Sequence, residues 1–144
     1  MSVFGSAKSV QAPAYEVSHD EAEWQQRLTP EQYRVLRRHG TERAGSSPLD
    51  REKRTGQFLC AGCDAALFAS EAKFDSGTGW PSFTAPVAEA AVDTQEDRGL
   101  MMSRTEVHCA RCGGHLGHVF PDGPRPTGLR YCMNGAAMKF EPEA

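Results

Sequence analysis

The fold is decided by two short stretches of sequence, Cys60-Ala61-Gly62-Cys63 and Cys109-Ala110-Arg111-Cys112. Two thiolates on one tight turn lie close enough to share an ion, and two such turns complete the tetrahedron that zinc prefers. Residues 64–108 separate the two pairs, a longer gap than the ~15–20 residues of a simple zinc ribbon. We therefore predict one structural Zn²⁺ per chain, which ties together two hairpins that lie far apart in the sequence.

The same cysteines leave two other interpretations open. They could be two redox-active pairs or plain buried thiols, since the C-x-x-C pattern also occurs in disulfide oxidoreductases. In the zinc interpretation the four thiolates of Cys60, Cys63, Cys109 and Cys112 fill every position of the ion. No position is then left for water or substrate, so the predicted ion is structural.

Around these pairs the sequence predicts a β-rich body that follows an N-terminal helical arm. The capping-box pattern Ser18-His19-Asp20-Glu21 begins a predicted helix over residues 21–28. Thr29-Pro30 begins a second helix, and Gly40 is expected to end it. Segments with strand composition follow, separated by Gly, Pro, Asp and Ser. They are residues 57–60, 66–68, 91–94, 100–107, 115–120, 129–132 and 136–140.

Length and composition narrow the class of protein. The 144 residues fit one domain, which we place at residues 18–144 after a flexible tail at residues 1–17. A formal charge of −3 without a basic block argues against nucleic acid binding. No apolar run approaches the ~18 residues that span a bilayer, which argues against a membrane protein, and the N-terminus lacks an apolar signal segment. We expect a monomer in the cytoplasm, where a reducing environment keeps thiolates available for zinc.

The fifth cysteine, Cys132, lies outside the two pairs. A single cysteine is by default a small buried hydrophobic residue. On a strand, however, Arg130 and Asn134 share the face of Cys132, because both are two residues away. A nearby guanidinium favours the thiolate, which is the nucleophilic form of cysteine. Cys132 is therefore a candidate reactive residue.

Two other clusters could belong to the same site. His115 and His118 are three residues apart, so they face opposite sides of a regular strand unless a bulge or bend at Gly117 brings them together. The segment Gly79-Trp80-Pro81-Ser82-Phe83 holds two aromatic residues in a rigid loop. These aromatic residues could cap the core or form the apolar wall of a pocket.

Together these residues resemble the zinc-binding form of the B-type methionine sulfoxide reductases, which reduce the R epimer of methionine sulfoxide. The resemblance runs from about Thr29 to Phe140 and rests on three motifs, KFDSGTGWPSF at residues 73–83, GHLGHVFPDGP at residues 114–124 and RYCMN at residues 130–134. It implies a mainly β fold of two small antiparallel sheets tied by the zinc, with short N-terminal helices packed against them.

The resemblance also implies roles for individual residues. Cys132 would attack the sulfoxide sulfur and become a sulfenic acid. His115 and His118 would supply protons to the sulfoxide oxygen, and Asn134 would orient groups around the sulfur. The residues that would bind the substrate are Trp80, whose face packs on the methyl group, Phe120 at the pocket edge and Arg130, which favours the thiolate.

One position departs from the family pattern. Many members carry a resolving cysteine where this chain has Thr78, and the other four cysteines are assigned to the metal. We therefore expect thioredoxin or another external thiol to reduce the Cys132 sulfenic acid directly. The substrates would be oxidised proteins or free methionine sulfoxide.

Three rival classes make different predictions. A zinc-tied β fold could be a non-enzymatic binding module, but a scaffold has no need of the Arg-Tyr-Cys-x-Asn and Gly-His-Leu-Gly-His segments. A zinc hydrolase or deaminase needs an open position on its metal. A disulfide oxidoreductase would use its C-x-x-C pairs for redox chemistry and would hold no zinc.

Overall fold

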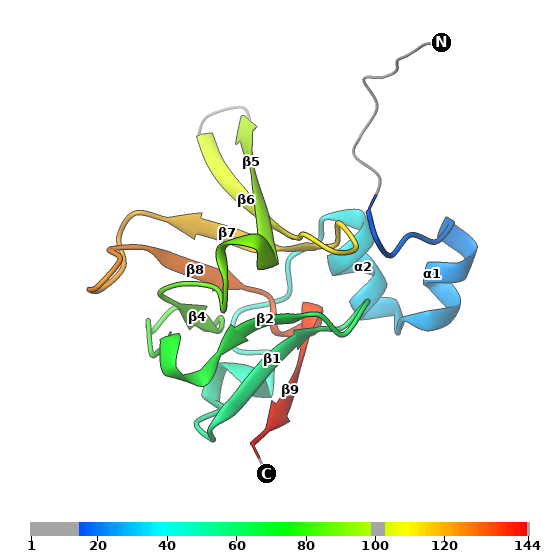
Figure 1. Ribbon diagram of the computed structural model, residues 1–144. Helices are drawn as coiled ribbons and strands as arrows, with labels where there is room; N and C mark the ends of the chain where they lie inside the picture. The colour runs from blue at the N-terminus through cyan, green and yellow to red at the C-terminus, as the bar shows by residue number, and fades with distance from the viewer. Residues whose placement is uncertain (1–14, 99–102, 144) are drawn as a thin grey trace.

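Two short helices precede the sheets in the computed structural model, which describes residues 15–98 and 103–143 (Figure 1). Helix α1 (Glu21–Arg27) begins after Asp20, whose side chain accepts a backbone N–H of the first turn at 2.8 Å. Helix α2 (Pro30–Arg38) begins with a capping box formed by Thr29 and Gln32. The prediction of two short N-terminal helices is confirmed.

Helix α2 is anchored by its apolar side. Val35 and Leu36 are fully buried there, and each such side chain contributes about 1.5–3 kcal/mol when it leaves water. The helix ends with His39 in the left-handed conformation at φ 56°, one residue before Gly40, where the sequence placed the end. This left-handed residue turns the chain back over the sheet and places the His39 side chain there.

One sheet has three strands in the order β2-β1-β9, all antiparallel. Strand β1 (Gly56–Cys60) is central, β2 (Ala66–Ala69) follows it through the first cysteine turn, and β9 (Met138–Pro142) comes from the C-terminal end of the chain. Figure 1 shows β9 beside β1, so the sheet joins segments far apart in the sequence.

The second sheet has six strands in the order β3-β4-β8-β7-β6-β5, again antiparallel. Its strands are β3 (Lys73–Phe74), β4 (Ser82–Phe83), β8 (Arg130–Met133), β7 (His115–Phe120), β6 (Ser103–Cys109) and β5 (Val92–Arg98). The predicted strand at residues 100–107 falls partly outside the described residues, and its described part belongs to β6. The expected fold of two antiparallel sheets is confirmed.

Aromatic side chains join the two sheets. Phe68 of β2 stacks on Phe83 of β4 with ring centroids 4.4 Å apart, and Phe58 of β1 meets the same ring at 5.0 Å. All three side chains are fully buried, so they form the centre of one shared core. The two sheets therefore share one hydrophobic core over the described residues.

The predicted flexible tail at residues 1–17 lies almost entirely outside the described residues, which begin at Tyr15. Within residues 15–98 and 103–143, none of the helices has the length and apolar character that crossing a membrane requires.

Candidate functional site

Four cysteine side chains meet at one end of the two sheets. Cys60 and Cys63 come from the turn between β1 and β2, and Cys109 and Cys112 come from the turn between β6 and β7. The sulfur atoms of Cys60 and Cys112 lie 3.7 Å apart, and those of Cys63 and Cys109 lie 3.5 Å apart. All four sulfur atoms are within 4.8 Å of one another, and none forms a disulfide. The predicted clustering of the two cysteine pairs is confirmed.

The donor set fits a structural metal ion. A tetrahedral zinc ion holds its sulfur ligands at about 2.3 Å, which places them about 3.8 Å from one another, close to the observed spacings. Four thiolates would leave no position for a substrate on the ion. An ion held by these four cysteines would join the three-stranded sheet to the six-stranded sheet as a structural metal.

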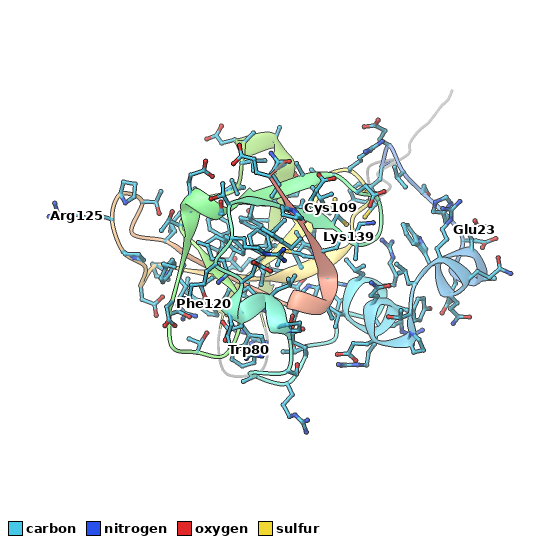
Figure 2. All side chains as sticks on the ribbon, turned by 90° about the horizontal axis from the view of Figure 1, so that it is seen from below. Glu23, Trp80, Cys109, Phe120, Arg125 and Lys139 are labelled. Carbon is cyan, nitrogen blue, oxygen red and sulfur yellow. The ribbon has the colours of Figure 1, made fainter. Side chains whose placement is uncertain are left out.

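A separate cavity of about 290 Å³ opens on one face of the six-stranded sheet. It brings together six of the seven residues that the sequence assigned to catalysis or substrate binding. Its lining residues are Thr41, Thr78, Trp80, Arg104, Gly117, His118, Phe120, Arg130, Cys132 and Asn134. In Figure 2, Trp80 and Phe120 mark this cavity, and Cys109 of the metal site lies well apart from them.

The strand register places the reactive groups side by side. Cys132 of β8 is paired with His118 of β7, and Arg130 is paired with Phe120 on the same two strands. Paired residues on neighbouring antiparallel strands point to the same face of the sheet. The thiol and an imidazole therefore share the floor of the cavity, with the guanidinium and an aromatic ring two residues away.

His115 reaches the same face through an irregularity in β7. Val107 pairs with Gly117 and His108 pairs with His115, so Leu116 is an extra residue in β7. This bulge supplies the bend that the sequence required at Gly117. The rings of His115 and His118 have centroids 5.6 Å apart, but His115 does not line the cavity and is only 1% exposed. Burial lowers the pKa of His115 to about 4, so its imidazole is neutral at pH 7.

The Cys132 thiol is under opposing electrostatic influences. Burial raises its pKa, while the positive charge of Arg130 and hydrogen bonds from Thr78 and Arg130 act in the opposite direction. Arg130 is shared with Asp122, whose carboxylate it contacts at 2.9 and 3.1 Å, and it also lies over the Phe120 ring at 4.5 Å. The net effect is a pKa above that of an ordinary cysteine, so the resting side chain is mainly a thiol at pH 7.

Changing either member of this ion pair should therefore shift the reactivity of Cys132. Arg130→Gln removes a positive charge that favours the thiolate, so the pKa of Cys132 should rise. Asp122→Asn removes a negative charge and frees Arg130, so the pKa should fall. The measurement is the rate of Cys132 alkylation by iodoacetamide against pH, with the product identified by peptide mass spectrometry.

A matched control comes from the same side of the molecule. Arg125 is exposed, so Arg125→Gln removes the same charge away from the cavity and should leave the alkylation profile unchanged. Coincident profiles for Arg130→Gln and the unmodified protein would show that Arg130 has no influence on the thiol.

The back of the cavity depends on Glu42, a residue that the sequence did not indicate. Its backbone oxygen accepts the indole N–H of Trp80 at 3.0 Å, and its backbone N–H donates to Asn134 Oδ1 at 2.8 Å. Its carboxylate accepts the backbone N–H groups of Gly135 and Ala136, both at 2.8 Å. Glu42 is 2% exposed, so it fixes Trp80 and the chain after β8 from inside the protein.

Asn134 is held by the same set of bonds. Its Nδ2 donates to the backbone oxygen of Leu116 at 3.0 Å, while its Oδ1 accepts the Glu42 N–H. The Asn134 side chain therefore spans from β7 to the loop after α2 and has one N–H left to offer the cavity. No local pattern marks Glu42, because its partners lie 38 to 94 residues away in sequence.

Comparisons with known proteins match most of the chain to one family. The SelR domain model matches residues 28–142. The chain is 54% identical over 129 residues to the peptide methionine sulfoxide reductase MsrB of Leptospira interrogans serogroup Icterohaemorrhagiae serovar Lai, covering 90% of this chain and 98% of that protein. It is 56% identical over 126 residues to the protein of the same name from Agrobacterium fabrum, covering 88% and 93%. The corresponding protein of Bradyrhizobium diazoefficiens is 57% identical over 127 residues, covering 88% and 91%.

Proposed function

Because the chain belongs to the SelR-domain family of MsrB peptide methionine sulfoxide reductases, we propose that it reduces the R epimer of methionine sulfoxide through Cys132. The observation that carries this proposal is the pairing of Cys132 with His118 on the floor of a cavity whose walls include Trp80 and Phe120. The cavity offers a nucleophile, a proton-transfer group and an apolar surface in one place.

The proposed reaction transfers one oxygen atom. The Cys132 sulfur attacks the sulfoxide sulfur, the S–O bond breaks, and the oxygen ends on Cys132 as a sulfenic acid while methionine leaves. The thiol proton and the sulfoxide oxygen are both retained in the sulfenic acid, so the step is balanced. The sulfoxide oxygen needs a proton as its bond to sulfur weakens, and His118 is the imidazole that lines the cavity beside Cys132.

The remaining residues fix the substrate. Trp80 and Phe120 offer apolar faces to the methyl group, and Asn134 offers its remaining N–H. Arg130 favours the thiolate as the substrate displaces water. The buried ring of His115 does not line the cavity, so we propose that His115 positions the neighbouring His118 ring and does not contact the substrate. The methyl group, the oxygen and the attacking Cys132 sulfur would each occupy a different side of the sulfoxide sulfur. Only one epimer fits such an arrangement, and we propose that it is the R epimer.

Regeneration is proposed to use an external thiol. Thr78 lines the cavity beside Cys132, so an alcohol stands where a resolving thiol would be needed. The other four cysteines are gathered in the metal cluster, for which we propose zinc. Thioredoxin or another thiol would then attack the sulfenic acid. The surface opening suits oxidised proteins as well as free methionine sulfoxide, and the cytoplasm suits a protein that needs reduced thiols.

A single turnover without reductant tests this proposal. The protein is mixed with excess racemic methionine sulfoxide and with dimedone, which traps sulfenic acids, and then analysed by intact and peptide mass spectrometry. We expect about one methionine per chain, loss of the R epimer only, and dimedone on Cys132. A disulfide within the chain would contradict regeneration by an external thiol. Consumption of the S epimer would contradict specificity for the R epimer. If folded protein forms no methionine, the proposed reductase function is overturned.

A further inference from the structure

A second group of potential metal ligands lies on the same sheet face, apart from the four cysteines. Glu106 and His108 come from β6, His115 comes from the bulged start of β7, and His39 caps the end of α2 above them. One ligand atom from each of these four residues lies within 4.8 Å of all the others. Three imidazoles and one carboxylate thus converge on one point.

The spacing is close to what a small divalent ion imposes. Glu106 Oε1 lies 2.9 Å from His108 Nε2, 3.5 Å from His39 Nδ1 and 4.0 Å from His115 Nδ1. A tetrahedral zinc ion holds nitrogen and oxygen ligands at about 2.0–2.2 Å, so these ligands lie about 3.3–3.5 Å from one another. The observed distances bracket this range, and small side-chain rotations would equalise them.

Polar contacts with Glu106 account for the placement of His108 and His39 but not for the burial of the His115 ring. His108 and His39 can each share a proton with Glu106, but neither ring nitrogen of His115 has a hydrogen-bond partner among the described residues. The ring is 1% exposed, and a buried polar group without a partner is costly. A ring nitrogen without a hydrogen-bond partner is a free donor atom for a metal ion. A metal ion would satisfy one of the two ring nitrogens.

We propose that His39, Glu106, His108 and His115 form a second metal site, which takes a divalent ion of the zinc class. Imidazole and carboxylate ligands suit such ions, and the absence of thiolates makes this site weaker and more exchangeable than the four-cysteine site. His39 is 58% exposed and offers a route from solvent, while the other three ligands are preformed on the sheet. This site shares His115 with the proposed reductase mechanism, but its metal binding is measured without that activity.

The test counts zinc ions and identifies their ligands. Protein that keeps its tightly bound metal is titrated with Zn²⁺ in a weak chelator buffer, and bound zinc is measured by mass spectrometry of the metal. We expect one further Zn²⁺ per chain, and ¹⁵N NMR of the histidine rings should show shifts for His39, His108 and His115 but not for His19. His39→Ala, at an exposed position that should not disturb folding, should weaken this binding at least about tenfold.

Three further variants locate the ion. Glu106→Gln should weaken binding as His39→Ala does, whereas His19→Ala removes an imidazole outside the cluster and should have no effect. Cys132→Ser excludes the reactive thiol as a ligand and should also leave the second ion bound. The proposal is overturned if no further Zn²⁺ binds, if His39→Ala and Glu106→Gln leave its affinity unchanged, or if only Cys132→Ser removes it.

Discussion

Cys132→Ser is expected to abolish methionine sulfoxide reduction, by on the order of 10⁴-fold or more, as for other catalytic nucleophiles. The reason lies in the product as well as the nucleophile. Oxygen transfer to cysteine gives a sulfenic acid, whereas the same transfer to serine would give a hydroperoxide with a weak O–O bond. A serine hydroxyl is also not ionised at neutral pH. The measurement is methionine formed from the R epimer over many turnovers with a thiol reductant present.

The same variant separates the enzyme from the binding-module alternative. Serine is close to cysteine in size, so Cys132→Ser should keep the unfolding temperature and the metal content of the unmodified protein. A protein that acted only as a scaffold would lose nothing in this variant. Reduction that persists in folded Cys132→Ser would show that another sulfur is the nucleophile.

The parts of the fold that were predictable are those set by short-range chemistry. Helix α2 follows from Thr29, Pro30 and Gln32, which satisfy the first turn locally. The two cysteine pairs were recognisable because each is a four-residue turn. The spacing of His115 and His118 also indicates a bulge or bend in β7, because the two residues can share a face only if the strand is irregular.

The parts that were not predictable depend on contacts between distant segments. Nothing near residue 138 indicates that β9 pairs with β1, because that pairing is fixed by the shared core and not by a turn. Glu42 lies in a segment without periodicity, and its role appears only when Trp80 and Asn134 are placed around it. His39 ends helix α2, and its position beside Glu106 depends on how α2 packs on the sheet.

The four-cysteine cluster, the proposed second metal site and the cavity are linked through β6 and β7. Cys109 ends β6 and Cys112 lies in the turn before β7, so the four-cysteine site fixes the register at which these strands begin. The bulge at Leu116 follows within a few residues and sets the direction of His118 toward Cys132. The geometry of the reactive pair therefore depends on the metal site, although no ligand of that ion reaches the cavity.

Removing the ion from the four-cysteine site should consequently destabilise the whole domain and not only the turn. Apparent binding free energies of structural zinc reach about 10–16 kcal/mol, whereas a domain of this size is stable by only about 5–15 kcal/mol. We expect Cys109→Ser, at a fully buried position, to lose the tightly bound ion and about 5 kcal/mol or more of unfolding free energy. Metal content and urea unfolding measure both effects.

Cys132→Ser is the matched control for this experiment, because it makes the same substitution at the one cysteine outside the cluster. Its metal content and stability should stay close to those of the unmodified protein. The ring contacts of Phe58, Phe68 and Phe83 involve no cysteine of the cluster directly, so Cys109→Ser, although destabilised, should retain compact sheet structure at low temperature even where the reactive pair is lost. Activity should then fall before the circular dichroism of the sheets does as temperature rises. If Cys109→Ser loses activity and sheet structure in parallel, the metal stabilises the fold without a separate influence on the cavity. If its stability is unchanged, the two sheets need no metal to stay packed together.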